Sequence, residues 1–280
     1  MLGIVSALAA SACWGVADFF GGLMSRRISS LTVTLGVEAA GLLIVAAIMA
    51  VVQPPTPTAA QAAWAVAGGL SGVVGLGAFY RALAIGTMSI VAPISSTGVA
   101  LPVLVGLAEG DRISTAQAFG LAFAFVGVIL AGRETEEDRD AGADTRLAVA
   151  LALAAALGFG GYFIAADQAA HGGVLWTLML GRAAAVPVLS VIALAVGTAL
   201  APPVPQAVRL LAVGAMDLAA TGLYAYATTQ GQLAVVAVLA ALYPVTTVLL
   251  ARGVLGERLT RVQDAGVVAA LAGVALIAAG

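Results

Sequence analysis

The sequence has no lysine, one cysteine (Cys13) and one histidine (His171). A disulfide framework or a Cys/His metal cluster needs several such residues, so neither can form within one chain. We therefore predict no metal site and no cofactor. All 12 basic residues are arginines and the net charge is −2. Nucleic acid is not an expected partner, because it is bound by basic residues clustered on one face.

Charge of either sign is also scarce. Only 9% of the residues are charged and 62% are hydrophobic, whereas a soluble domain carries about 25% charged residues. The apolar residues form repeated blocks of about twenty, the length that crosses a hydrocarbon layer roughly 30 Å thick as a helix. No segment is long and polar enough to cover such blocks in water. The composition predicts a multi-pass protein of the plasma (bacterial inner) membrane, surrounded by lipid.

Glycine, proline and charged clusters separate ten apolar segments. We expect an all-α membrane protein with transmembrane helices near residues 2–23, 31–52, 61–83, 89–108, 113–132, 147–168, 174–200, 206–228, 233–253 and 260–279. Ala10-Ser11-Ala12-Cys13 has the look of a lipoprotein processing site, but no positively charged region precedes it. Residues 2–23 are therefore expected to be a retained helix rather than a cleaved signal.

The two halves of the chain are similar in sequence. Residues 110–132 align with 256–278 at a constant offset of 146, and Gly15 and Gly86 meet Gly160 and Gly231 at an offset of 145. We predict two five-helix units, 1–132 and 147–280, joined by an acidic loop over 133–146. Because each unit has an odd number of crossings, the second enters the membrane from the opposite side. Such inverted-topology repeats are typical of secondary transporters, which bind their solute between the repeats.

Three motifs resemble those of a known family. They are Trp14-Gly15, Tyr243-Pro244 and Leu255-Gly256-Glu257-Arg258-Leu259-Thr260. With the ten-helix pattern, they resemble the EamA family of the drug/metabolite transporter (DMT) superfamily. In the first half Asp111 stands in place of the glutamate, and Gly98 or Val99 in place of the proline. The resemblance implies a carrier of small metabolites, often working outward.

Among the ionisable residues of the predicted helices, Glu38, Arg182 and Asp217 lie near the middle of their helix and Asp18 lies toward the end of the first. An ionisable side chain near the bilayer centre costs at least about 2.5 kcal/mol, so each should face a partner or a cavity. Glu38 and Arg182 are nearly equivalent in the two repeats, at an offset of 144. We predict that they are in contact, either as a static buried ion pair or as a gating or substrate-binding pair.

Asp217 begins a polar stripe. Thr221, Tyr224 and Thr228 follow it at spacings of 4, 3 and 4, which puts all four on one helix face. The equivalent first-half residues are Gly72, Leu76, Phe79 and Leu83, so the fold itself does not require this polarity. We expect the stripe either to line the solute pathway or to make hydrogen bonds between helices. In the first case Asp217 carries a coupling proton or pairs with a cationic group of the solute.

Further candidate site residues are aromatic and acidic side chains and helix prolines elsewhere in the chain. Trp14 and Asp18 share a face of the first helix, where Asp18 faces the pathway or pairs with Arg26 or Arg27. Tyr162 and Tyr243 are expected to be cavity walls, packing residues or interfacial anchors. Pro93, Pro187 and Pro244 can bend helices near the membrane centre.

Orientation is predicted differently by two criteria. Arginines concentrate near odd-numbered loops, and the even-numbered loops contain only Arg112. The positive-inside rule then places both termini outside, whereas resemblance to the family implies termini in the cytoplasm. A monomer and a homodimer both remain open.

The leading functional hypothesis is a secondary transporter that exports small metabolites or drug-like solutes by alternating access. The sequence has no GxxxxGK[ST] loop for ATP. Two alternatives are an intramembrane lipid-modifying enzyme, for which clustered catalytic residues are lacking, and a passive channel. We therefore expect a non-enzyme whose partner is a small-molecule solute.

Overall fold

The computed structural model describes residues 1–86, 88–131, 143–200, 202, 204–255 and 260–279. Over these residues the chain is helical, without strands. The first half contains α1 (Leu2–Ser25), α2 (Ser30–Val52), α3 (Ala59–Ile85), α4 (Met88–Ser96), the short 3₁₀ helix η1 (Thr97–Val99), α5 (Ala100–Glu109) and α6 (Thr115–Ala131). The second half contains α8 (Ala143–Ala170), α9 (Val174–Ala195), α10 (Val204–Thr228), α11 (Leu233–Ala240), α12 (Tyr243–Leu255) and α13 (Arg261–Ala279).

Each of the ten predicted segments corresponds to helix, and two of the segments are interrupted. The fourth is α4, η1 and α5, and the ninth is α11 and α12 with a break at residues 241–242. Thr97 lies at the first break and Leu242 at the second. The two residues are 145 positions apart, which is the offset that relates the two halves. Pro244 follows the second break, where the lack of a backbone N–H is tolerated because the helix is just beginning. Of the three prolines expected to bend helices, only Pro244 stands directly at a break, since Pro93 lies inside α4 and Pro187 inside the unbroken α9.

Eight of the described segments are long and apolar enough to cross a membrane. They include the interrupted ones, counted as Val91–Glu109 and Leu233–Val254. The chain is thus a multi-pass membrane protein. The remaining two predicted spans are α6 and α13, which pack against each other, and their crossing of the membrane stays a prediction. Residues 143–146 of the predicted linker are the first residues of α8, and its other residues lie outside the described ones.

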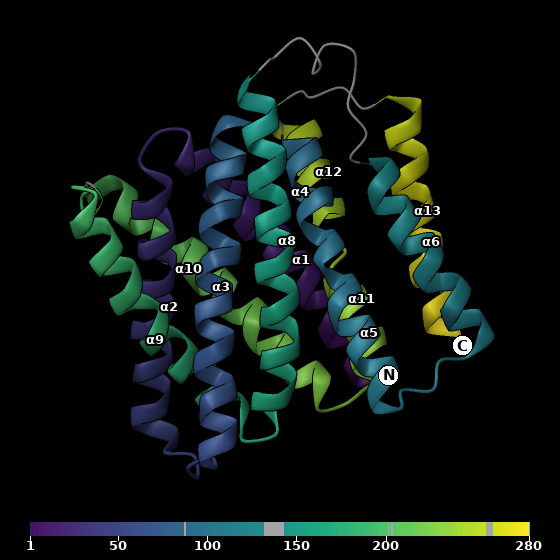
Figure 1. Cartoon of the computed structure of the whole chain (residues 1–280), viewed down its shortest axis with the longest axis horizontal. Helices are drawn as coiled ribbons and strands as arrows, with labels where there is room; N and C mark the ends of the chain where they lie inside the picture. The colour runs from purple at the N-terminus through teal and green to yellow at the C-terminus, as the bar shows by residue number, and fades with distance from the viewer. Residues whose placement is uncertain (87, 132–142, 201, 203, 256–259, 280) are drawn as a thin grey trace.

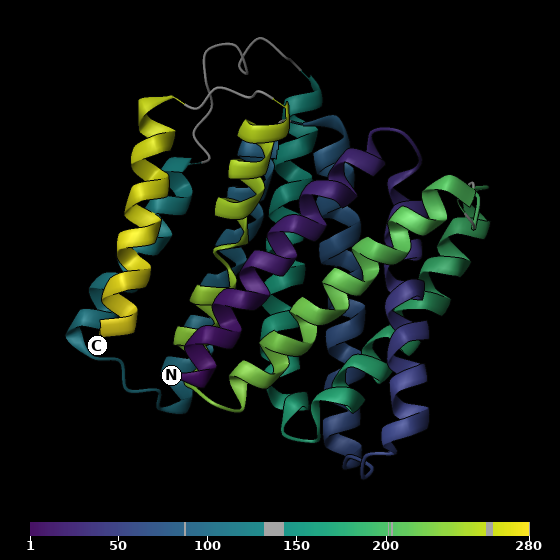
Figure 2. The same ribbon diagram turned by 180° about the vertical axis from the view of Figure 1, so that it is seen from behind.

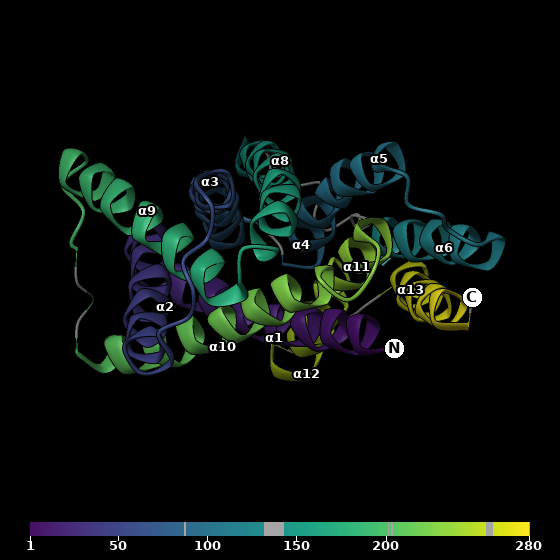
Figure 3. The ribbon, with the colours of Figure 1, turned by 90° about the horizontal axis from the view of Figure 1, so that it is seen from below.

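Contacts between helices recur when each helix is exchanged for its counterpart in the other half. Helix α3 of the first half packs on α8 of the second half. Their counterparts, α10 and α1, also pack on each other. Figure 1 shows α3 and α8 side by side on one face, and Figure 2 shows α1 and α10 on the opposite face. Figure 3 shows the same pairs from below as two layers, with α6 and α13 together at one end. The two halves are therefore interleaved rather than adjacent.

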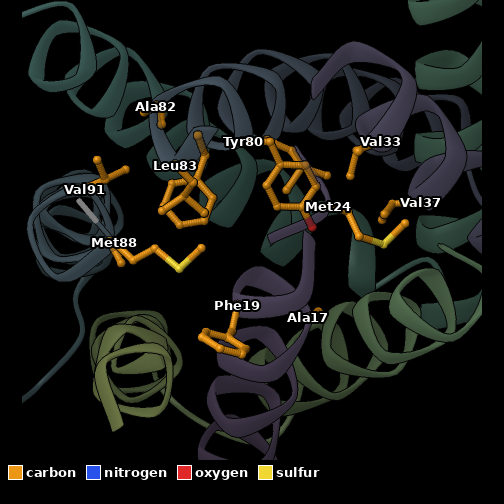
Figure 4. Packing of buried hydrophobic residues seen from close by; sticks show 14 of the residues in the cluster. Ala17, Phe19, Met24, Val33, Val37, Tyr80, Ala82, Leu83, Met88 and Val91 are labelled. Atoms are coloured by element: carbon orange, nitrogen blue, oxygen red, sulfur yellow. The ribbon is translucent and has the colours of Figure 1, made fainter. Parts of the chain in front are cut away.

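The hydrophobic core is made from side chains of several helices. In one cluster, Phe19 of α1, Val33 of α2, Leu83 of α3 and Met88 of α4 are fully buried. Figure 4 shows these side chains converging, together with Tyr80 of α3. This packing fixes the position of α1 against α3, and both helices contribute to the site described next.

Candidate functional site

Three charged side chains from three helices meet in the interior. Arg182 of α9 donates one hydrogen bond to Glu38 of α2 at 3.1 Å and another to Asp217 of α10 at 2.7 Å. All three residues are buried, with exposed fractions of 5%, 7% and 7%. The predicted contact between Glu38 and Arg182 is confirmed. Asp217 joins the same guanidinium, which the sequence analysis did not anticipate.

The backbone around this charge cluster makes room for it. A Cβ atom on Gly41, one turn after Glu38, would collide with the side chain of Arg182, so the guanidinium lies directly against α2 at a glycine. The Thr221 hydroxyl donates to the Asp217 carbonyl at 2.6 Å, and Arg182 also donates to Thr221 at 3.4 Å. Buried charges are tolerated when each has an opposite partner and further hydrogen bonds. Here the guanidinium of Arg182 is the partner of both the Glu38 and the Asp217 carboxylates.

The cluster lines a cavity between helices of both halves. Trp14 and Asp18 line it from α1, Tyr162 and Phe163 from α8, and Tyr243 from α12. Glu38, Arg182, Asp217 and Thr221 line it too. Eight of the nine predicted site residues therefore surround one cavity, and the exception is Tyr224. Helix α3 contributes small residues to the lining: Ala65, Gly68, Gly69 and Gly72.

Asp18 differs from the other two carboxylates. It is 5% exposed and has no ion-pair or hydrogen-bond partner in the described part of the chain. The alternative pairing with Arg26 is wrong, because Arg26 donates instead to the carbonyls of Leu83 at 3.3 Å and Gly86 at 3.4 Å. Arg27 makes no ion pair with Asp18 either, over the described residues. Asp18 and Asp217 line the same cavity.

The polar stripe on α10 divides into two parts. Asp217 and Thr221 line the cavity, whereas Tyr224 and Thr228 do not. The Tyr224 hydroxyl donates to the Phe163 carbonyl at 3.0 Å, and its ring packs on Phe163 at 4.8 Å between ring centres. The Thr228 hydroxyl donates to the Ala225 carbonyl at 3.0 Å. Asp217 and Thr221 thus face the cavity, Tyr224 makes a hydrogen bond between helices, and Thr228 bonds within α10, which neither alternative predicts.

Trp14 connects this packed region with the cavity. Its ring lies 6.3 Å from Tyr162, 5.7 Å from Phe163 and 5.8 Å from Tyr224, measured between ring centres. Since Trp14 also lines the cavity, this aromatic group is one of its walls. Phe159 and Thr177 line the cavity as well and were not singled out in the sequence. An apolar ring and one threonine in an apolar helix carry no signal that distinguishes them from packing residues.

Fold and site together define a membrane protein of the transporter type, with a mostly apolar cavity that holds a few charged and polar groups and is enclosed by two interleaved halves. The profile of the EamA-like transporter family matches residues 1–133 and again 146–279. The chain therefore belongs to the EamA family, which is part of the DMT superfamily. The resemblance inferred from the motifs is confirmed.

The fold is also that of solved structures. One of them, titled "Crystal structure of protein", is similar with a TM-score of 0.74 at 16% sequence identity. The similarity covers 98% of this chain and 95% of that one. At this identity the likeness concerns the fold alone. A search of curated proteins finds no match.

Proposed function

We propose that this protein is a secondary transporter that moves small metabolites or drug-like solutes outward by alternating access around the central cavity. The observation that carries the proposal is the buried cluster of Arg182, Glu38 and Asp217, which lines a cavity between the halves. Charges inside a membrane protein are expensive and face a partner or a pathway. A purely structural cluster would not need a cavity beside it.

The arrangement of the helices supports alternating access. The reciprocal pairs α3–α8 and α1–α10 relate the halves as an approximate two-fold axis would. We propose that this axis lies in the membrane plane, as in inverted repeats, so that rocking of one half against the other opens the cavity to each side in turn. The equivalent breaks at η1 and at residues 241–242 lie where such movement can bend helices.

The cavity is asymmetric, which suits recognition of a solute. Asp217 and Thr221 line it from α10, and their first-half equivalents, Gly72 and Leu76, line it from α3. The α10 contribution is therefore polar, while the α3 contribution is small and apolar. Ligand sites combine these features: a few placed polar groups orient the solute within a mostly apolar enclosure.

Flux in proteoliposomes tests the proposal against its alternatives. Purified protein should give saturable flux of solutes selected by a toxicity-rescue or efflux screen on overexpressing cells. Flux that rises linearly without saturation would identify a channel. Chemical change of the vesicle lipids without solute flux would identify a lipid-modifying enzyme. Arg182→Gln should abolish flux, whereas Asp264→Asn serves as the control, since Asp264 lies in an exposed ion pair with Arg252 away from the cavity.

Coupling is tested by imposing a pH gradient across the same vesicles. If Asp217 carried the coupling proton, Asp217→Asn would uncouple flux from the gradient. The 2.7 Å hydrogen bond from Arg182 to Asp217 instead favours a role in holding the guanidinium at the wall of the solute cavity. We therefore expect Asp217→Asn to lower the affinity for the solute, with unchanged dependence on the pH gradient. Uncoupled flux in this variant would contradict that assignment.

A further inference from the structure

The cavity contains more acid than base. Asp18, Glu38 and Asp217 line it with one cation, Arg182. That cation donates to Glu38 and Asp217 and makes no ion pair with Asp18 over the described residues. A carboxylate removed from water without a partner is costly. Asp18 is therefore the group in this cavity whose charge a cationic ligand would neutralise.

Asp18 lies between two close contacts of α1 with other helices. Gly15 and Gly21 are three residues before and after it and share its face of the helix. A Cβ on Gly15 would collide with the Tyr243 carbonyl, and one on Gly21 with the Tyr80 hydroxyl. Tyr243 of α12 therefore contacts α1 about one turn before Asp18, and Tyr80 of α3 contacts it about one turn after Asp18.

Both tyrosines carry a polar atom that the protein does not use. The hydroxyls of Tyr80 and Tyr243 are buried and have no hydrogen-bond partner within the described residues. The Tyr80 hydroxyl lies against Gly21, three residues after Asp18, and Tyr243 contacts α1 at Gly15, three residues before it. Buried hydroxyls normally find a partner, so unused ones beside an unpaired carboxylate indicate a ligand site. Of the two, only Tyr243 lines the cavity together with Asp18, as far as the described residues show.

We propose that Asp18 and Tyr243 bind a primary ammonium group of the transported solute, with the Tyr80 hydroxyl behind them. This inference rests on the proposed function and specifies the class of solute. A primary ammonium has three N–H donors, and two carboxylate oxygens and a hydroxyl can accept all three. The aromatic wall made by Trp14, Tyr162 and Phe163 packs against the apolar body of the solute and favours a cation near the rings.

Binding to the purified full-length protein in detergent tests the proposal without requiring transport. The probes are four compounds with the same phenyl body: phenethylammonium, its N,N,N-trimethyl derivative, 2-phenylethanol and 3-phenylpropionate. Calorimetric titration should show the primary ammonium binding at least tenfold more tightly than the other three. The trimethyl compound keeps the charge but has no N–H to donate, so it isolates the hydrogen bonds. Equal or tighter binding of the anion or the alcohol would overturn the proposal, as would no binding of phenethylammonium.

Variants assign the site to Asp18. Asp18→Asn should weaken phenethylammonium binding at least tenfold, Tyr243→Phe several-fold, and Asp264→Asn not at all. A melting curve without ligand verifies that each variant is folded. Unchanged affinity in folded Asp18→Asn would overturn the assignment, and Asp18→Glu should retain part of the affinity because it keeps the charge. Phenethylammonium binding without flux in proteoliposomes would instead contradict the proposed function and leave the ammonium site standing.

Discussion

Arg182 holds together the most highly charged part of the interior. Its guanidinium is the partner of both Glu38 and Asp217, and all three side chains are almost completely shielded from solvent. Removing the shared cation leaves two buried carboxylates without a partner. Removing one of the carboxylates leaves a guanidinium that still has the other. The three residues are thus unequal in their importance for stability.

Arg182→Met should lower the stability of the folded protein by about 3–5 kcal/mol, the range seen when one partner of a buried pair is removed. The triple variant Glu38→Gln, Arg182→Met and Asp217→Asn should recover most of this loss, because no unpaired charge remains. Melting temperatures in detergent measure both effects. A triple variant as unstable as the single one would show that packing, and not charge, accounts for the loss. Transport should be absent in both variants.

Part of this cluster can be predicted from the sequence. Glu38 and Arg182 are expected to be in contact because they occupy nearly equivalent positions of two repeats, and residues near a two-fold axis meet their equivalents. Asp217 has no ionisable equivalent, since Gly72 stands in its place. Its approach to Arg182 depends on how α10 is rotated against α9. One sequence without its tertiary structure contains no measure of that rotation.

At the scale of elements, α3 and α9 approach until their backbones touch. A Cβ on Gly69 would collide with the backbone of Gly181, the residue directly before Arg182. Small residues at such crossings let helices pack closely in lipid, where dispersion rather than hydrophobicity drives association. The close approach also sets the position of Arg182 in the cavity.

Gly69→Ala should destabilise the protein by roughly 1–3 kcal/mol, the usual cost of overpacking, and reduce transport by displacing Arg182. Gly77→Ala on the same helix is the matched control, because nothing lies within 4 Å of the added Cβ. That variant should be neutral or slightly more stable, since alanine favours helix by about 1 kcal/mol over glycine. Melting curves and proteoliposome flux of the two variants compare them directly. Equal effects would mean that the α3–α9 contact can relax.

The loop between α5 and α6 supports an interrupted helix of the other half. The Asp111 carboxylate accepts a hydrogen bond from the Ala234 backbone N–H at 2.9 Å, in the first turn of α11. The Gln232 side chain donates to the Arg112 carbonyl at 3.0 Å. The first N–H groups of a helix lack partners within it, and a carboxylate satisfies them well. The acidic residue of the predicted motif thus has a structural role between the halves.

Asp111→Ala should lower stability by about 1 kcal/mol, as does loss of a capping side chain. Asp111→Asn should cost less, because its amide oxygen still accepts the hydrogen bond. Hydrogen exchange at the start of α11 should be faster in Asp111→Ala than in Asp111→Asn. If both variants exchange like the unmodified protein, the contact does not stabilise α11. The equivalent motif residue, Glu257, lies outside the described residues.

At the scale of the whole molecule, the two halves are held together by packing along their whole length. Helix pairs α3–α8, α1–α10, α2–α9 and α6–α13 each join one half to the other. Each half alone would expose the faces that these pairs bury. The predicted linker over residues 133–146 connects halves that already bind each other.

Residues 1–132 and 147–280, expressed together as separate chains, should therefore assemble and transport. Either chain expressed alone should be inactive and rapidly degraded. Co-purification through a tag on one chain and flux in proteoliposomes measure assembly and function. Failure of the two chains to co-purify would show that the linker is needed to bring the halves together.

The sequence by itself determined the environment, the helices, the repeat and the family. These follow from apolar blocks of membrane-spanning length, from their punctuation and from similarity between distant segments, all of which can be read along the chain. It also identified which acids and arginine lie inside helices, because their cost in lipid makes them conspicuous. Helical periodicity placed Asp217 and Thr221 on one face with Tyr224.

The tertiary structure decided which of these side chains meet. It joined Asp217 to Arg182 and packed Tyr224 against Phe163. Among the residues that the structure describes, it left Asp18 and the hydroxyls of Tyr80 and Tyr243 without a partner. Periodicity fixes the side of a helix on which a residue lies. Whether two such sides face each other depends on the rotation and crossing of packed helices, which arise from contacts between residues far apart in the chain.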